Sequence, residues 1–468
     1  MNSTKDVSLH SSTYAAEQDS QDPLQHLRAA FVIPTRSDLT SDTAGPPASP
    51  SPDEHDHKEI TYFCGNSLGL QPRLARRYLE QYLSTWATKG VHGHFKRLRD
   101  TALPPWLDCD SSLQDDMARL VGAQADEIAM MQTLTGNLHL MMCSFYRPTA
   151  QRWKIIMEGK AFPSDHYAVE SQIRIHDLPV ESSMILIEPP SGSSPLLPIE
   201  HILSIIDQHA SETALLLLPG IQFYTGQLLD IPRITAHAQR QGILVGWELA
   251  HAAGNVPLRL HEWNVDFAVW CTYKYLNCGP GCMGGCFVHE RHNERPRLTG
   301  WWGSKKQSRF AMTNQFEPMD GAAGWQLSNP SVADSTAVRA SLDVFNKTSM
   351  DALRDKSLAL TGYLESMLDR LAEEQDKLLP GGHCFSIITP RDPHGRGAQL
   401  SVRLRPGLLD SILETLERGS VVLDERKPDV IRVAPAPLYN SYMDVFNFVH
   451  VFAEACMNAI KRSASGVE

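Results

Sequence analysis

Between about residues 115 and 290, short apolar runs alternate with segments of helical periodicity, and this alternation restricts the possible fold more than any other feature. The apolar runs lie at residues 155–157, 184–187, 214–218, 243–247 and 267–270, with helical patterns at 199–209 and 231–241. Short buried strands separated by helices predict an α/β fold with a mostly parallel central sheet. Ligands of such sheets bind beyond the carboxyl ends of the strands, so the residues that follow each run are candidate site residues.

The chain on either side of this region has a different character. We expect residues 1–20, which are polar and lack apolar periodicity, to be a disordered and dispensable tail. Residues 21–100 are expected to be an N-terminal segment that contributes to a smaller domain and to dimer contacts. Within this segment, 22–32 has the pattern of a short amphipathic helix, and 37–57, rich in Ser, Pro and Asp, that of a flexible loop.

Residues 101–335 are expected to form the large α/β domain, and residues 336–468 a smaller α+β domain. The small domain should begin with a long helix over 338–371 and close with a helix over 442–460. Between these helices, the segments FSIITP, AQLSVRLR and VIRVAP are typical of strands.

Charge and cysteine content narrow the class of protein. The net charge of −11 gives no electrostatic support to binding of nucleic acid or of an anionic membrane surface. No apolar run approaches the roughly 20 residues that span a bilayer, and the N-terminus lacks the apolar core of a signal peptide. Nine cysteines in a chain of this length indicate reduced thiols, so we expect a cytoplasmic protein without a membrane or nucleic-acid partner.

Two ionisable residues follow neighbouring strands of the expected sheet. Glu248 comes directly after the run at 243–247, and Tyr273-Lys274 comes shortly after the run at 267–270. A cofactor with a pyridine ring and an aldehyde needs this pairing, because the carboxylate keeps the ring nitrogen protonated and the amine condenses with the aldehyde. From spacing alone, an ordinary surface lysine near a loop carboxylate remains an alternative. Glycines at 279, 281, 284 and 285 would let the backbone pass close to a ligand.

Two further segments suit the other parts of such a cofactor. Leu134-Thr135-Gly136-Asn137 precedes an apolar run, and the free N–H groups of a helix beginning there would attract a phosphate. Phe162-Pro163-Ser164-Asp165 follows the run at 155–157, where a phenyl ring could stack on a flat cofactor and Asp165 could add a second carboxylate. Taken alone, the first segment is more typical of an ordinary capped helix, and the second of an ordinary turn.

Cys278, Cys282 and Cys286, followed by His289 and His292, invite comparison with a zinc site. The three-residue spacers between the cysteines differ from the two-residue spacers common in structural zinc sites, and glycines interrupt them. We therefore expect buried small thiols and no metal site.

Together, these segments resemble the kynureninase family over about residues 22–460. The resemblance rests on FCGNSLGLQP at 63–72, TLTGNLHLMM at 133–142, KAFPSDHYAVESQ at 160–172, PGIQFYTGQ at 219–227, VGWELAHAAGNVPL at 245–258, DFAVWCTYKYLNCGPG at 266–281, GWWG at 300–303, SNP at 328–330 and IRVAPAPLYNS at 431–441. It implies a homodimeric enzyme with the fold of type I transferases dependent on pyridoxal 5′-phosphate (PLP). Such an enzyme hydrolyses L-kynurenine to anthranilate and alanine, and 3-hydroxy-L-kynurenine to 3-hydroxyanthranilate and alanine, in tryptophan catabolism and NAD biosynthesis.

The resemblance also implies a role for individual residues. Lys274 would carry the cofactor and act in catalysis together with Tyr273. The other cofactor-binding residues would be Leu134, Thr135, Phe162, Pro163, Ser164, Asp165, Glu248 and His251, with Trp301 and Asn329 reaching the site from the partner subunit. Ser67, His94 and Asn329 would contact the aryl end of the substrate, and Arg432 its α-carboxylate, which a guanidinium matches with two parallel bonds.

The chain departs from the family pattern at three positions. Glu248 stands where the family has Asp, Pro219 where some members have a small hydroxyl residue that contacts the phosphate, and Gly136 where Val is common. Glutamate is longer by one methylene, which puts protonation of the pyridine nitrogen in question. Two other functions therefore stay open: a desulfurase or aminotransferase on the same scaffold, and a non-catalytic relative that keeps only a binding role.

Overall fold

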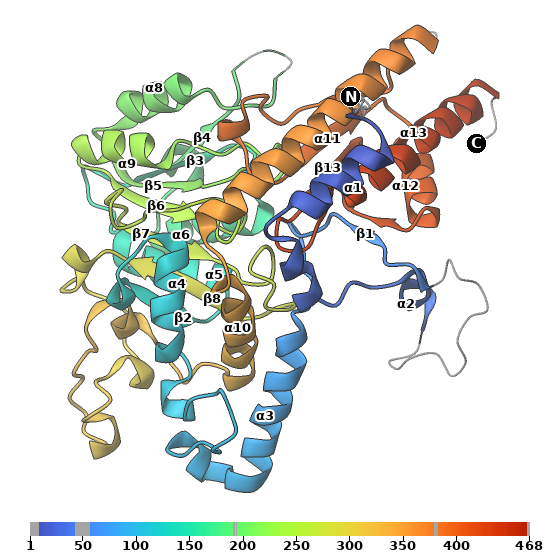
Figure 1. Ribbon diagram of the computed structural model, residues 1–468. Helices are drawn as coiled ribbons and strands as arrows, with labels where there is room; N and C mark the ends of the chain where they lie inside the picture. The colour runs from blue at the N-terminus through green and yellow to red at the C-terminus, as the bar shows by residue number, and fades with distance from the viewer. Residues whose placement is uncertain (1–8, 43–56, 191, 193, 379–381, 466–468) are drawn as a thin grey trace, which may run out of the picture. The chain divides into compact units, whose positions relative to one another are not determined.

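The computed structural model describes residues 9–42, 57–190, 192, 194–378 and 382–465 (Figure 1). The chain divides into two compact units. The larger unit comprises residues 74–223 and 227–350, and the smaller one comprises the residues up to Arg73, Tyr224–Gly226 and the residues from Asp351 onward.

The larger unit is built on a seven-stranded sheet in the order β2-β8-β7-β6-β5-β3-β4. The strands are β2 (Ile128–Met131), β3 (Lys154–Glu158), β4 (Met184–Ile187), β5 (Thr213–Pro219), β6 (Leu244–Glu248), β7 (Phe267–Trp270) and β8 (Gly284–Val288). Every neighbouring pair from β4 to β7 is parallel, and β8 pairs antiparallel with both β7 and β2. The predicted α/β fold with a mostly parallel sheet is confirmed, and each of the five apolar runs forms a strand.

Helices cover both faces of this sheet because successive side chains of each buried strand point to opposite faces. On one face, apolar side chains of β3, β5 and β7 pack with those of α5 (Leu134–Phe145) and α6 (Pro163–Ile175). On the other, α9 (Ile231–Arg240) lies beside α8 (Ile199–His209) (Figure 1). The buried indole of Trp247 donates to Thr235 of α9. The remaining helices of this unit are α3 (Arg73–Lys89), α4 (Gln114–Val121), α7 (Val180–Ser183) and α10 (Val332–Phe345).

The glycines that follow Lys274 serve the fold in two ways. Gly279 and Gly281 have φ values of +92° and +70°, which side chains rarely adopt, and they form the turn into β8. A Cβ on Gly285 would lie 2.2 Å from the Trp270 ring, and one on Gly284 2.9 Å from the Asn137 amide. Gly284 and Gly285 therefore permit close packing of β8, rather than the passage of backbone along a ligand that the sequence suggested.

The smaller unit contains a four-stranded antiparallel sheet in the order β12-β13-β10-β9. These strands are β9 (Phe385–Ile387), β10 (Leu400–Leu404), β12 (Asp424–Arg426) and β13 (Val430–Val433), and a separate parallel pair joins β1 (Thr61–Tyr62) to β11 (Val421–Val422). The helices are α11 (Met350–Leu378), α12 (Leu409–Arg418) and α13 (Tyr442–Ser465), whose apolar faces share one core with the sheet. The three strands and the closing helix predicted here are confirmed.

The single helix predicted over 338–371 is wrong. The chain forms α10 and α11 instead, separated at residues 346–349. Asn346 is the C-cap of α10, and the polar Asn-Lys-Thr-Ser segment that follows interrupts the apolar periodicity. Side chains of Asn, Thr and Ser compete for backbone hydrogen bonds, which disfavours a helix interior.

The N-terminal region is more ordered than the sequence indicates. Helix α1 (Ser12–Gln21) occupies most of the expected disordered tail, whose first eight residues lie outside the described residues. The expected helix at 22–32 is a 3-10 helix over Gln25–Ala30. The expected loop at 37–57 begins within α2 (Arg36–Thr40), and its residues 43–56 also lie outside the described residues.

Asp19 explains why α1 is held in place. Its carboxylate accepts the backbone N–H groups of Tyr442 at 2.7 Å and Met443 at 3.0 Å, the first two residues of α13. Ser441 Oγ accepts the N–H of Asp444 at 3.1 Å. Together, these groups satisfy the free N–H donors of the first turn of α13.

Replacing Asp19 with alanine is expected to destabilise the smaller unit by about 0.5–2 kcal/mol, the usual effect of losing a helix cap. Urea denaturation followed by circular dichroism would measure the change. Glu17, an acidic residue on the same helix, provides the control: Glu17→Ala should leave stability nearly unchanged. Equal stability of Asp19→Ala and the unmodified protein would restore the view that residues 12–20 are dispensable.

Among the described residues, no helix is both long enough and apolar enough to cross a bilayer.

Candidate functional site

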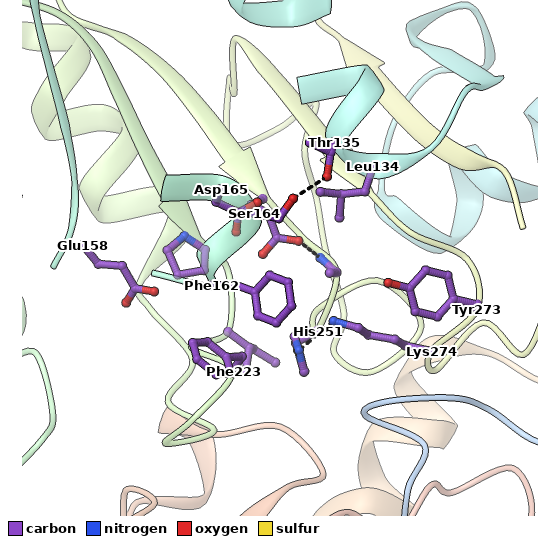
Figure 2. A pocket seen from close by; sticks show the side chains of 14 residues that line it. Leu134, Thr135, Glu158, Phe162, Ser164, Asp165, Phe223, His251, Tyr273 and Lys274 are labelled. Atoms are coloured by element: carbon purple, nitrogen blue, oxygen red, sulfur yellow. Dashed lines mark hydrogen bonds between the residues drawn. The ribbon is translucent and has the colours of Figure 1, made fainter. Parts of the chain in front are cut away.

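Four neighbouring parallel strands end at one edge of the large sheet, and their ends carry chemically reactive side chains. Glu158 is the last residue of β3, Pro219 of β5 and Glu248 of β6, and Pro219 lies opposite Glu248 in the sheet register. Strand β7 ends at Trp270, shortly before Tyr273 and Lys274. Glu158, Pro219, Glu248, Tyr273 and Lys274 all line one pocket at this edge (Figure 2).

Two helix N-termini complete the pocket. Helix α5 begins at Leu134 and α6 at Pro163, and Thr135 Oγ1 lies 2.8 Å from Ser164 Oγ (Figure 2). Pro163 stands at the first helical position, where its missing N–H is not needed. Neither N-cap residue makes a side-chain bond to its helix, so the positive ends of both helix dipoles remain open to an anion.

Lys274 lies between a histidine and an aromatic ring. Its Nζ is 2.8 Å from His251 Nε2 and 5.8 Å from the centre of the Phe162 ring. Phe162 contacts Phe223 edge-on at 5.4 Å between ring centres, while 44% of Phe162 remains exposed (Figure 2). A ring held edge-on by a neighbour and exposed on its other side can stack on a flat cofactor.

Three buried carboxyl groups line the pocket beside the lysine. Burial raises the pKa of Glu158 to about 8, with the Glu248 charge adding to the effect. Burial also raises the pKa of Glu248 and holds that of Asp165 well above its usual range, although Lys274 opposes both shifts. The site therefore holds more negative groups than its one lysine balances, and a bound cation such as a pyridinium would stabilise their charged forms.

The carboxylates of Glu248 and Asp165 differ in their hydrogen bonds. Glu248 Oε1 accepts the backbone N–H of Ala250 at 2.6 Å, so the longer side chain turns back onto its own loop. Asp165 Oδ1 is buried and has no hydrogen-bond partner among the described residues. A buried acceptor without a partner costs free energy, and a protonated ring nitrogen would remove that cost.

The chemistry of the pocket suits PLP. It combines a lysine amine, an exposed phenyl face, two open helix N-termini and the unpaired Asp165 oxygen. These features fit the aldehyde, ring, phosphate and ring nitrogen of the cofactor, respectively.

Tyr273 is half-buried next to the lysine. Burial and the adjacent Cys271 raise the pKa of its hydroxyl further above the usual value. The hydroxyl therefore stays protonated near neutral pH and can donate a hydrogen bond or a proton, but it is a poor base.

The sequence did not indicate four of the residues that line the pocket: Glu158, Ile221, Phe223 and Ala250. Glu158 could have been found, because it directly follows the apolar run at 155–157 and strand ends carry ligand-binding residues. Ile221, Phe223 and Ala250 lie in loops after β5 and β6, and no pattern in the sequence distinguishes them.

Glu158→Gln is expected to make stability less sensitive to pH. A carboxyl whose folded pKa exceeds its unfolded value contributes stability at low pH that is lost as pH rises from about 4.5, the unfolded value, to about 8. Glutamine cannot ionise, so the variant should gain stability relative to the unmodified protein over this interval. Urea denaturation at pH 5, 7 and 9 measures the difference, and a constant difference would show that Glu158 ionises normally.

Four predicted residues of the larger unit do not line this pocket: Pro163, at the start of α6, and His94, Trp301 and Asn329. His94 lines a second pocket with Phe95, Lys306 and Phe310, and its ring contacts Trp106 at 5.2 Å. Trp301 is 46% exposed and donates to the Arg309 carbonyl at 3.1 Å, and Asn329 is exposed.

Ser67 and Arg432 lie together in the smaller unit, where both bind Asp424. Arg432 Nε donates to Asp424 Oδ1 at 2.6 Å, and its second terminal nitrogen donates to Asp424 Oδ2 and, at 2.9 Å, to Ser67 Oγ. Ser67 Oγ also donates to Asp424. Burial raises the pKa of Asp424, but the bonds to Arg432 outweigh this effect and hold it below its usual value. The pairing with Asp424 was not predicted.

The cysteines considered for zinc do not converge on the two histidines. Cys278 and Cys282 donate to the carbonyls of Leu276 and Asp334, and Cys286 is buried in β8 against Met141. Burial raises the pKa of the Cys278 and Cys286 thiols, so both stay protonated near neutral pH.

Known proteins resemble this chain over nearly its whole length. A model named "Aminotransferase class-V" matches residues 113–377, and "Kynureninase C-terminal domain" matches residues 353–452. The kynureninase of Coccidioides immitis is 57% identical over 95% of this chain and 94% of its own length. Kynureninase 1 of Aspergillus niger is 59% identical over 92% of this chain and 93% of its own length.

Solved structures share the fold at low sequence identity. A C-DES mutant with glycine covalently linked to its PLP cofactor has a TM-score of 0.70 at 16% identity, covering 86% of this chain and all of that one. The apo cysteine desulfurase of Thermococcus onnurineus has a TM-score of 0.67 at 14% identity, covering 85% of this chain and 95% of that one. These likenesses support the PLP-dependent transferase fold, and the long matches to curated relatives show that the chain belongs to the kynureninase family.

Proposed function

We propose that this chain is a PLP-dependent hydrolase that cleaves L-kynurenine to anthranilate and L-alanine, and 3-hydroxy-L-kynurenine to 3-hydroxyanthranilate and L-alanine. The observation that carries the proposal is the placement of Lys274 beside His251 in a pocket that also holds two helix N-termini and the unpaired Asp165 oxygen. Relatives named as kynureninases, at 54–59% identity, support this reaction over others on the same scaffold. The reaction belongs to tryptophan catabolism and supplies NAD biosynthesis.

Each part of the cofactor has a candidate partner in the pocket. Lys274 would hold the aldehyde, the first turns of α5 and α6 with Thr135 and Ser164 would hold the phosphate, and Phe162 would lie against the ring. Asp165 pairs with the ring nitrogen, since Glu248 Oε1 is occupied by the Ala250 N–H. When bound, PLP acts as an electron sink for the bonds at the α- and β-carbons of the substrate.

The side chains of the site move the protons. The Lys274 amine would take up the α-proton of the substrate, and His251 would hold that amine in position through its Nε2. Tyr273, protonated near neutral pH, donates a hydrogen bond or a proton next to the lysine. Water adds to the γ-ketone, the Cβ–Cγ bond breaks, anthranilate leaves and Cβ is protonated, so one water is consumed per substrate.

We assign substrate recognition to four residues that do not line the pocket around Lys274. Arg432 and Ser67 would bind the carboxylate and aryl ends of the substrate, respectively. His94 and Asn329 would contact the aryl end and set the choice between the 3-hydroxy and unsubstituted forms. A site built to pair a hydroxyl rejects the analogue lacking it.

A homodimer accounts for the exposed aromatic surface of the larger unit. Trp86, Phe95, Trp301 and Phe310 are 45–58% exposed, and Phe310 contacts both Phe95 and Trp301. Contiguous exposed apolar side chains mark interaction surfaces, and a second copy would bring Trp301 and Asn329 to the partner's site. Light scattering coupled to gel filtration tests the dimer, and a monomer with full activity would contradict it.

The cellular compartment proposed is the cytoplasm. All nine cysteines, each within the described residues, are free thiols, and eight are buried. Unpaired cysteines in this number suit a reducing compartment. Fractionation of cells with an antibody to the protein tests this assignment.

Product analysis tests the proposed reaction. The purified protein, loaded with PLP, is incubated separately with kynurenine, 3-hydroxykynurenine and cysteine. Equal amounts of alanine and an anthranilate from either kynurenine support the proposal. Alanine with sulfide from cysteine, a keto acid, or bound cofactor without turnover would overturn it in favour of a desulfurase, an aminotransferase or a non-catalytic relative.

Glu248→Asp is expected to leave kcat within about threefold of the unmodified enzyme, which is less than 1 kcal/mol in the barrier. The reason is that Glu248 bonds its own loop while Asp165 supplies the free carboxylate oxygen. Asp165→Asn should lower kcat by at least about 10-fold, because a charge-assisted hydrogen bond to the ring nitrogen is lost. Steady-state kinetics and the absorbance of bound PLP are compared for the two variants. A large fall in kcat for Glu248→Asp with Asp165→Asn unaffected would reverse the two roles.

A further inference from the structure

Three side chains outside the cofactor pocket point their ligand atoms at one another. Glu127, His261 and His289 each offer one such atom, and all three atoms lie within 4.8 Å of one another. His261 Nδ1 is 3.0 Å and His289 Nδ1 is 3.5 Å from Glu127 Oε1. None of the three lines the pocket around Lys274.

The geometry is that of ligands around a small divalent ion. Zinc binds imidazole nitrogen and carboxylate oxygen at about 2.0–2.2 Å, so adjacent ligands in a tetrahedral or octahedral shell lie roughly 3.0–3.5 Å apart. The two nitrogen–oxygen distances fall in this interval. The glutamate side chain is fully buried, whereas 36% of the His261 side chain is exposed, which gives an ion a path from solvent and room for a water ligand.

The fold brings these residues together from three separate segments. Glu127 directly precedes β2, His289 directly follows β8, and β2 pairs with β8. His261 comes from the loop before β7, where its backbone N–H donates to the Gly122 carbonyl at 3.0 Å. The backbone N–H groups of Gln124 and Glu290 donate to Glu127 at 3.0 Å each and orient its carboxylate.

We propose that Glu127, His261 and His289 form a structural site for a divalent transition-metal cation of the zinc class. Two imidazoles and one carboxylate favour such a cation over Ca²⁺ or Mg²⁺, which prefer oxygen ligands. The ion would link the start of β2, the loop before β7 and the end of β8. The site was not expected from the sequence, because Glu127 and His261 are far from His289 along the chain.

Hydrogen bonding is the alternative use of the same three side chains. Glu127 accepts from His261 in the absence of an ion, and Gln124 Nε2 lies 3.2–3.3 Å from both ring nitrogens of His261. A hydrogen-bonded cluster and a metal site therefore share similar distances. Only a metal site would take up a cation, and that uptake would require both histidines.

Titration with Co²⁺ distinguishes the two. The PLP-loaded protein, freed of metal with a chelator, is titrated while calorimetry and the visible ligand-field bands of Co²⁺ are recorded. We expect one ion per chain with bands typical of nitrogen and oxygen ligands, and a higher melting temperature. His261→Ala and His289→Ala should each weaken binding by more than about 100-fold, since even outer-shell partners contribute 10–100-fold.

His237→Ala is the matched control. His237 bonds a carboxylate, Asp207, at 2.7 Å, but no second histidine joins the pair. Co²⁺ binding should be unchanged in this variant, and PLP absorbance should be unchanged in all three, because none lies in the cofactor pocket. Absence of Co²⁺ uptake, or uptake that survives both histidine replacements, would overturn the proposal and leave a hydrogen-bonded cluster.

Discussion

Replacing Lys274 with alanine is expected to abolish turnover, with a loss of at least about 10⁴-fold in kcat. Lys274 supplies the only amine among the residues that line the pocket. In the proposed function it serves both as the covalent attachment for PLP and as the base for the α-proton, and a general base alone contributes about 10²–10⁴-fold. His251, 2.8 Å away, cannot form the same attachment, so no neighbouring side chain replaces the amine.

Borohydride reduction provides a measurement that does not depend on activity. The unmodified protein should keep PLP after reduction and denaturation, whereas Lys274→Ala should release it. Lys160→Ala serves as the control, because Lys160 is exposed in the turn after β3 and does not line the pocket. A reducible link to PLP that persists in Lys274→Ala would remove this residue from its proposed role.

The central fold could be predicted because most of its strands are buried on both faces. Short apolar runs that alternate with helical patterns indicate buried strands. The chain has five such runs, at residues 155–157, 184–187, 214–218, 243–247 and 267–270. Helix α1 could not be predicted in the same way. It is polar, and the group that holds it, the N-terminus of α13, lies 423 residues away from Asp19 along the chain.

The site was predictable where it depends on strand ends. Glu248 and Lys274 follow apolar runs directly or closely, and the structure brings both to the pocket with Thr135, Phe162, Ser164 and Asp165. Individual side-chain hydrogen bonds were not predictable. The return of Glu248 to the Ala250 N–H and the pairing of Arg432 with Asp424 depend on side-chain conformation, which no spacing in the sequence encodes.

Arg432→Ala is expected to have two separate effects, one on stability and one on substrate binding. Arg432 is 1% exposed and makes two hydrogen bonds to Asp424, whose side chain is 15% exposed. Without Arg432, Asp424 keeps only Arg426 at 3.4 Å and the Ser67 hydroxyl as partners, so stability should fall, by at most the roughly 3–5 kcal/mol of a fully broken buried pair. Loss of a charged hydrogen bond to the substrate carboxylate, about 1.5–3 kcal/mol, should also raise KM roughly 10–150-fold.

The double variant Arg432→Ala/Asp424→Ala separates these effects. Replacing Asp424 as well should recover much of the stability, because replacing both members of a buried pair costs less than replacing one. It should not recover KM, because the guanidinium proposed to bind the substrate carboxylate is still missing. Urea denaturation and steady-state kinetics on kynurenine are measured for Arg432→Ala, Asp424→Ala and the double variant. If KM returns to normal together with stability, Arg432 has only a structural role in pairing with Asp424, and another cation must bind the substrate carboxylate.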